Sequence, residues 1–313
     1  MAQDGVEDRA NREAIPCRIL HHLKRILWLV GGERLASSSH GHIHREGTMR
    51  AAWVTDIHLD FLRHAECEAF FVSILRESPD VIFVTGDISI APSLLTHLEA
   101  MTQALNRPIY FVLGNHDFYR GSITAVRTAV REHMRGRPLL TYLPEAGIVP
   151  LTSSTALVGH DGWGDSRYGN YATSSVKLND HLYIKELTGL TSPQLQERLM
   201  RLGNEAALYL RQTLPEACDH YSHVILLTHV PPFRESCWYQ GQVSNDEWLP
   251  FFACQAVGDA LHETMRARPQ CQLSVYCGHT HNSGIAHVLP NLTVFTGAAE
   301  YGMPHVNAMI EVQ

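Results

Sequence analysis

The chain has 313 residues, of which 45% are hydrophobic, and its formal net charge of −7 gives an isoelectric point near 6.3. This length and apolar content are enough to bury a large core, and one domain of about 260 residues is expected. The acidic balance argues against a broad basic surface, and therefore against a nucleic-acid partner.

The N-terminal residues 1–48 differ in composition from the rest of the chain. They begin with polar and charged residues, contain a short amphipathic piece at 19–30, and pass through three serines into a histidine-rich stretch at 40–44. This composition predicts a disordered N-terminal extension, followed by one domain over 49–313. A regulatory or membrane-touching arm, or a metal-loading histidine cluster, is the alternative for the extension.

Five apolar runs along the domain end in residues that are common metal ligands. The runs are 51–55 before Asp56-Ile57-His58, 81–85 before Gly86-Asp87, 109–113 before Gly114-Asn115-His116-Asp117, 224–228 before His229, and 273–277 before Gly278-His279-Thr280-His281. Apolar runs of this length are typical of strands buried on both faces. In open α/β sheets the chemistry lies at the carboxyl ends of the strands, so these groups are expected to meet at one edge.

Helices are predicted between these strands. Apolar residues recur at helical spacing over 70–75, over 94–105 with Ser93 as the cap, over 123–134 with Gly136 just beyond the end, over 195–210 after a cap at Thr191 or Ser192, and over 251–266. The helix after Thr191 belongs to a long segment, 160–222, which is predicted to be an insert that lines or covers the active site.

Each motif alone has an ordinary structural explanation. A DxH sequence is more often a turn, and an aspartate after a strand is often the N-cap of a helix. With twenty histidines in the chain, several will lie near carboxylates by chance. The five motifs in order, each at the end of a predicted strand, nevertheless favour a metal site.

In this order the motifs resemble the signature of the calcineurin-like metallophosphoesterases: DxH, GD, GNHD, a single His, and GHxH. Two positions depart from the family pattern. Ser89 and its neighbours stand where a second acid often follows GD, and Thr228 stands where Gly or Ser often precedes the single His. The resemblance implies an α/β fold, the four-layer α/β/β/α metallophosphoesterase sandwich with two mixed β-sheets.

The resemblance also implies a phosphoesterase with two metal ions. The implied ligands are Asp56, His58, Asp87 and His281 for one ion, and Asp87, Asn115, His229 and His279 for the other, with Asp87 as the bridge. A ligand set without thiolate favours Mn, Fe or Zn over a structural zinc site. Two cations about 3.5–4 Å apart would hold a bridging hydroxide in line for attack on a phosphomonoester or phosphodiester.

Two further residues of the GNHD motif are implied to be catalytic. His116 would hydrogen-bond the phosphoryl oxygen and protonate the leaving group, and Asp117 would orient its ring and keep it basic. Neither is expected to bind metal.

Substrate contacts are predicted in the loop at 160–168. Arg167 offers a planar fork for a second anionic group, and Trp163 or Tyr168 could stack on a base or another ring. The alternative is that Arg167 pairs with Asp161 or Asp165 and only holds the loop.

The location and the rival functions also follow from the sequence. Seven cysteines without CxxC spacing indicate free thiols in a reducing compartment, and the apolar stretch 26–30 is too short to span a bilayer, so a cytoplasmic protein is predicted. The expected partner is a small phosphate ester. The rivals are a nuclease acting on DNA or RNA, and a non-catalytic scaffold of the same fold, although scaffolds typically lose the catalytic His or several ligands.

Overall fold

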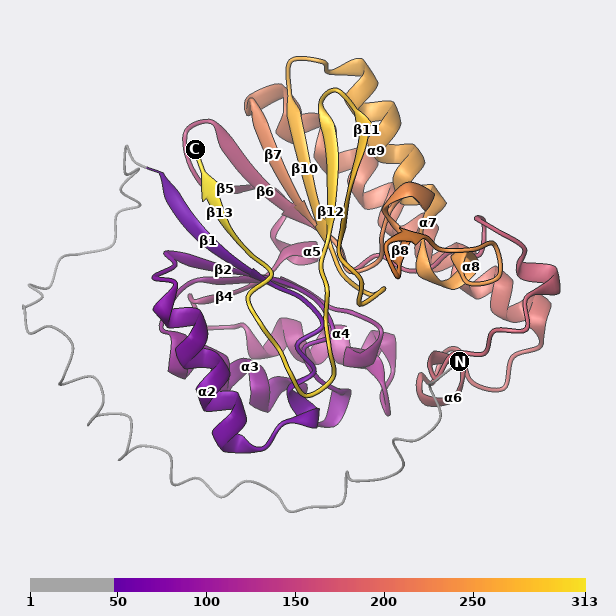
Figure 1. Ribbon diagram of the computed structural model, residues 1–313, viewed down its shortest axis with the longest axis horizontal. Coiled ribbons are helices and arrows are strands. Elements are labelled where there is room, and N and C mark those ends of the chain that lie inside the picture. The colour runs from indigo at the N-terminus through magenta and orange to yellow at the C-terminus, as the bar shows by residue number, and fades with distance from the viewer. Residues whose placement is uncertain (1–47) are drawn as a thin grey trace, which may run out of the picture. The chain divides into compact units, whose positions relative to one another are not determined.

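Two β-sheets form the centre of the computed structural model, which describes residues 48–313 (Figure 1). The first sheet has the order β13-β1-β2-β3-β4, with β1 Met49–Val54, β2 Val81–Thr85, β3 Ile109–Val112, β4 Leu140–Tyr142 and β13 Ala308–Val312. The second has the order β11-β12-β10-β7-β6-β5, with β5 Val149–Pro150, β6 Thr155–Gly159, β7 His223–Leu227, β10 Gln272–Cys277, β11 Gly284–Leu289 and β12 Leu292–Thr296. The central strands of each sheet are parallel, and the edge strands β13, β11 and β5 are antiparallel to their neighbours, so both sheets are mixed, as predicted.

The alternation of side chains along the strands divides the core into layers. In β1, Ala51 and Trp53 belong to the cluster between the two sheets, which also contains Ile225 of the second sheet. Ala52 and Val54 point the other way, into the cluster under the helices. Because successive side chains of a strand face opposite sides, one apolar run supplies both layers, and this is why the predicted strands are apolar throughout.

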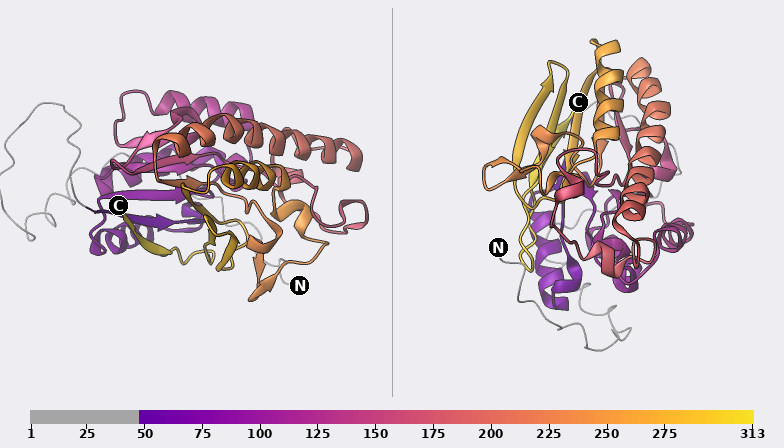
Figure 2. Two further views of the ribbon diagram at one scale, coloured as in Figure 1. Left: turned by 90° about the horizontal axis from the view of Figure 1, so that it is seen from above. Right: turned by 90° about the vertical axis from the view of Figure 1, so that its right-hand side faces the viewer.

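Helices cover the outer faces of both sheets, which gives the predicted four layers (Figure 1, Figure 2). The helices over the first sheet are α2 His64–Arg76, α3 Ala91–Leu105 and α4 Ile123–His133, and those over the second are α7 Ser192–His220 and α9 Gln255–Ala267. The shorter helices are α5 Leu143–Ala146, α6 Asp180–Tyr183 and α8 Leu249–Phe252, and a small ribbon pairs β8 Trp238–Tyr239 with β9 Gln242–Val243.

Two helix boundaries differ from the prediction. α3 begins at Ala91, so Ser93 lies inside its first turn and not at the cap. The helix predicted over 251–266 is two helices, because the chain breaks at Ala253 and Cys254. The carboxylate of Asp165 accepts the backbone N–H of Gln255 and Ala256, and so caps α9 from another segment. A cap supplied from 90 residues away has no local sequence signal.

The segment 160–222 has two structural parts. Its second part is α7, whose buried face packs in the core of the second sheet. Thr191, one of the two predicted caps, is its N-cap and forms a capping box with Gln194. α7 is therefore a layer of the fold, and only residues 160–191, which include α6, form an irregular excursion. Apart from Thr48, the predicted extension over 1–48 lies outside the described residues.

Two findings bear on the cysteine and membrane predictions. The six cysteines at or beyond position 67 are all buried free thiols. Among residues 48–313, no helix combines the length and the apolarity that crossing a membrane requires.

Candidate metal centre

The predicted ligands lie in the loops at the carboxyl ends of strands from both sheets. Asp56, His58, Asp87 and Asn115 follow β1, β2 and β3, whereas His229, His279 and His281 follow β7 and β10. Five of them, namely Asp56, His58, Asp87, His279 and His281, have φ between 40° and 70°. Each such non-glycine residue costs roughly 1–3 kcal/mol, and such strain gathers at functional sites.

Two glycines make room for this arrangement. A Cβ on Gly114 would lie 2.2 Å from Oδ1 of Asp87, and one on Gly278 would lie 2.0 Å from Oδ2 of Asp56. Both distances are far below van der Waals contact. The glycine in GNHD and the first residue of GHxH are therefore required because a ligand carboxylate lies against their backbone.

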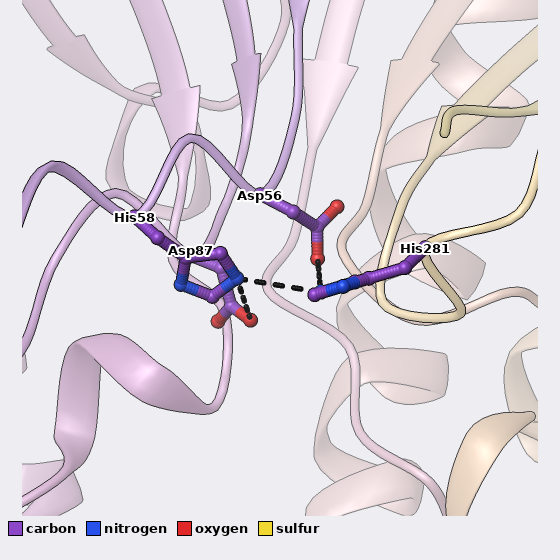
Figure 3. A group of neighbouring side chains, drawn as sticks. All are labelled: Asp56, His58, Asp87 and His281. Carbon is purple, nitrogen blue, oxygen red and sulfur yellow. Dashed lines mark hydrogen bonds and ion pairs between the residues drawn. The ribbon is translucent and has the colours of Figure 1, made fainter. Parts of the chain in front are cut away.

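Four side chains form the first group of ligands (Figure 3). They are Asp56, His58, Asp87 and His281, and their ligand atoms all lie within 4.8 Å of one another. Nε2 of His58 is 3.3 Å from Nε2 of His281 and 3.8 Å from Oδ2 of Asp87. Nε2 of His281 is 3.3 Å from Oδ1 of Asp56.

Burial and neighbouring charges shift the pKa values of the candidate ligands in both groups. It lowers the pKa of His58 to about 3 and that of His279 to about 3, so both imidazoles are neutral. Burial alone would raise the pKa of Asp56, but the hydrogen bond with His281 and the nearby imidazoles hold it below its usual range. Burial and the charge of Asp56 raise the pKa of Asp87. Burial alone would lower the pKa of His281, but the hydrogen bond to Asp56 outweighs burial and raises that pKa. Cation binding requires the opposite forms, an anionic Asp87 and a neutral His281, so a bound cation would shift both groups back.

Asn115, His229 and Asp87 form the second group. Nδ1 of His229 donates to the carbonyl oxygen of Thr85 at 2.8 Å, which turns Nε2 toward the other side chains of the group. That Nε2 is 3.1 Å from Oδ1 of Asn115 and 3.4 Å from Oδ1 of Asp87. The ring of His279 lies beside that of His229, with centroids 5.0 Å apart, and its Nε2 donates to the carbonyl oxygen of Phe251.

The donor atoms fit two cations. In the second group, Nε2 of His229, the amide oxygen of Asn115 and a carboxylate oxygen of Asp87 converge. In the first group, Nε2 of His58 lies 3.3 Å from Nε2 of His281, and these two nitrogens face the carboxylates of Asp87 and Asp56. Buried lone pairs that face one another are unfavourable unless a cation lies between them. Asp87 directs one oxygen to each group, as a bridging ligand requires.

His116 lies beside the first group, but Asp117 does not touch its ring. The His116 ring stacks on Tyr119 at a centroid distance of 4.2 Å and contacts His58 edge-on at 4.6 Å. Asp117 is fully buried and its carboxylate accepts the backbone N–H of Ile88, Ser89 and Gly114. The prediction that Asp117 orients the His116 ring is therefore wrong. Asp117 instead joins the loop after β2 to the loop after β3, and Tyr119 positions the His116 ring.

The three predicted substrate contacts lie in structural positions. Trp163 is buried in the core and packs near Phe118, with ring centroids 5.7 Å apart. Tyr168 packs on a small cluster around Cys237. Arg167 donates to Oδ2 of Asp165 at 2.6 Å and to Asn204 at 2.8 Å. These contacts favour the alternative in which Arg167 holds the loop.

Arg167→Ala is therefore expected to lower stability more than it alters substrate binding. The substitution removes a charged partner from the buried carboxylate of Asp165, which costs about 1–3 kcal/mol. Thermal denaturation should show a lower Tm, whereas Arg201→Ala, which breaks the exposed pair with Glu197, should change it little. An unchanged Tm together with a raised KM for one substrate would contradict this and restore a pocket role.

Asp180 is a site residue that the sequence did not reveal. It lies on α6 and is buried, and its Oδ1 accepts from Nδ2 of Asn115 at 2.8 Å and from the hydroxyl of Tyr119 at 2.7 Å. The first bond turns the amide oxygen of Asn115 toward His229, and the second fixes the tyrosine under His116. The excursion over 160–191 thus holds two groups of the centre in place. No spacing connects Asp180 with Asn115, because 65 residues separate them.

Asp180→Ala is expected to lower the metal affinity of one of the two sites selectively, namely the site that contains Asn115. Losing such an outer partner typically costs about 10–100-fold in metal affinity. Calorimetric titration with Mn²⁺ should show one weakened and one nearly normal site, and Asp180→Asn, which keeps an acceptor oxygen, should recover part of the loss. Two unchanged affinities in the alanine variant would mean that Asn115 needs no such support.

The comparisons with known proteins agree with this geometry. A sequence profile of the family described as calcineurin-like phosphoesterase matches residues 49–283. The structure is similar to the phosphopantetheinyl hydrolase of Mycobacterium tuberculosis, with a TM-score of 0.58 and 13% identity, covering 84% of this chain and 95% of that one. It is also similar to a dimetal phosphatase from Danio rerio, with a TM-score of 0.54 and 14% identity, covering 84% and 92%.

At these identities the likeness to solved structures shows the fold alone. A search of curated protein sequences found no match. The profile, however, spans most of the chain, from the first strand to the GHxH motif. The protein belongs to the calcineurin-like phosphoesterase family.

Proposed function

We propose that the protein is a metal-dependent phosphoric ester hydrolase that cleaves a small phosphomonoester or phosphodiester with two bound ions of Mn, Fe or Zn. The observation that carries the proposal is the convergence of six side chains, delivered by strands of both sheets, on two adjacent groups of donor atoms, with the ring of His279 beside the second group. Carboxylate, amide and imidazole donors without thiolate suit these metals. When bound, such cations neutralise the phosphoryl oxygens and activate water for attack on phosphorus.

The chain's own residues would divide the work. Asp56, His58 and His281 hold one ion, Asn115, His229 and His279 hold the other, and Asp87 joins them. His116 lies at the edge of the first group, with Nε2 4.0 Å from Oδ2 of Asp87. Its partly exposed ring is placed to donate a hydrogen bond to a phosphoryl oxygen and to pass a proton to the leaving group.

A substrate screen tests the proposal. The purified protein is stripped with a chelator, reloaded with Mn²⁺, and assayed on monoesters, diesters, cyclic nucleotides and single-stranded DNA. We expect turnover of at least one small ester in the loaded protein, and none in the stripped protein. Cleavage of DNA alone would support the nuclease instead. No turnover with Mn²⁺, Fe²⁺ or Zn²⁺ would contradict the proposal and favour a scaffold.

A further inference from the structure

Two exposed aromatic side chains lie against the first group of ligands. Phe61 is 43% exposed and Tyr301 is 44% exposed, and their ring centroids are 4.9 Å apart. The ring of Tyr301 is also 4.5 Å from that of His58 and 4.9 Å from that of His281. The pair is therefore in contact both with solvent and with two of the predicted metal ligands.

The chain fixes this pair in place from two distant segments. Phe61 ends the single turn Leu59–Phe61 that follows the DxH motif. Tyr301 lies in the loop after β12, and Asn307 holds that loop: its Nδ2 donates to Ala298, and its backbone N–H donates to Trp53 at 2.8 Å. These bonds anchor the two ends of the loop that carries Tyr301 beside the centre.

The aromatic surface continues on the other side of His116. The ring of Tyr301 is 6.1 Å from that of His116, which stacks on Tyr119. Tyr119 is in turn 5.7 Å from Tyr183, which is 45% exposed. A group bonded to a phosphate at the metal centre would thus leave the centre across aromatic rings. Tyr119 itself is buried, so the exposed rings are Phe61 and Tyr301 on one side of His116 and Tyr183 on the other.

We propose that the substrate carries a flat aromatic ring, which packs against Phe61 and Tyr301 while its phosphate lies at the metal centre. This inference rests on the proposed function and adds the chemical class of the organic group. Rings of aryl groups and of nucleobases share the required chemistry, since either can stack on or meet the edge of another ring. The Tyr301 hydroxyl is not needed for such packing. The ring of Tyr301 alone would therefore produce the preference for aromatic over non-aromatic substrates.

Matched esters test the inference. Benzyl phosphate and cyclohexylmethyl phosphate both release a primary alcohol on hydrolysis. The two alcohols are similar in size, and only benzyl alcohol is aromatic. Their methyl diesters replace them if the screen identifies diesters as substrates. Adenosine 5′-monophosphate and ribose 5-phosphate form a second pair, which distinguishes a nucleobase from a bare aryl group. We expect kcat/KM to favour the aromatic member of at least one pair by about threefold to tenfold.

Three variants assign the preference to the rings. In Tyr301→Ala the ratio of aromatic to non-aromatic kcat/KM should fall toward 1, and in Tyr301→Phe it should stay near that of the unmodified protein. Leu208→Ala, which trims an exposed apolar residue on α7, should leave the ratio unchanged. Because a ratio is compared, a general loss of folded protein does not affect the result.

The outcomes separate the two proposals. Turnover with equal rates on both members of both pairs, or a preference that Tyr301→Ala retains, would overturn the aromatic subsite and leave the hydrolase intact. If no ester is turned over, calorimetric titration of the Mn²⁺-loaded protein decides the matter without turnover. Benzylphosphonate should bind about threefold to tenfold more tightly than methylphosphonate, and equal affinities would overturn the inference.

Discussion

Asp87→Asn is expected to lose both metal ions and nearly all activity. Within residues 48–313, Asp87 is the side chain that directs an oxygen to each group, with Oδ2 3.8 Å from His58 and Oδ1 3.4 Å from His229. Two cations a few ångströms apart repel each other, and a shared anion offsets that repulsion. Removing the charge should lower the metal affinity of both sites by more than about 100-fold. That figure is the upper end of the loss seen when a residue that only hydrogen-bonds a ligand is changed.

Elemental analysis after reloading with Mn²⁺ checks this result. Asparagine keeps the shape of the side chain and an oxygen that can accept the backbone N–H of His116, now bonded to Oδ1 at 2.8 Å. Asp259→Asn, an exposed substitution on α9, is the matched control and should retain normal metal content. Two ions per chain in the Asp87 variant would contradict the bridging assignment.

His116→Gln is expected to lower kcat about 10²–10⁴-fold, the usual cost of losing a general acid. Metal content should stay normal, because the ring lies beside the first group and is not one of its donors. The loss should be large for an alkyl ester, whose alkoxide needs a proton, and much smaller for a p-nitrophenyl ester, whose leaving group is already stable as an anion.

The comparison of the two esters identifies the role of His116. His287→Gln, an exposed histidine on β11, is the control and should not change either rate. Equal losses on the alkyl and the p-nitrophenyl ester would mean that His116 stabilises the phosphoryl oxygens and does not protonate the leaving group. Unchanged kcat on both would remove His116 from the mechanism.

The clustering of the candidate ligand residues could be predicted from the sequence because their placement is a local property of the chain. An apolar strand buried on both faces must end at the sheet edge, and the next residues, Asp56 after β1 or Asp87 after β2, must then lie there. Parallel pairing of the central strands brings these ends together. Helical periodicity gave the helices between the strands, whereas the two-sheet sandwich was implied by the family resemblance.

Contacts made across the fold could not be found in this way. Asp117 follows the predicted catalytic histidine directly, yet its carboxylate binds the loop after β2 and not the ring beside it. Trp163 lies in a loop of polar and glycine residues, which suggested exposure, yet its ring fills the core. Asp180 and Tyr301 reach the centre from segments whose local sequence carries no motif. Such contacts depend on tertiary packing, which overrides local pattern.

The most direct test of the two-metal assignment is the anomalous difference density of crystals grown with Mn²⁺. Two bound metal ions would give two peaks about 3.5–4 Å apart, one on each side of the Asp87 carboxylate. One peak should contact Asp56, His58 and His281, and the other should contact Asn115, His229 and His279. A single peak, or peaks held by other side chains, would contradict the two-metal assignment.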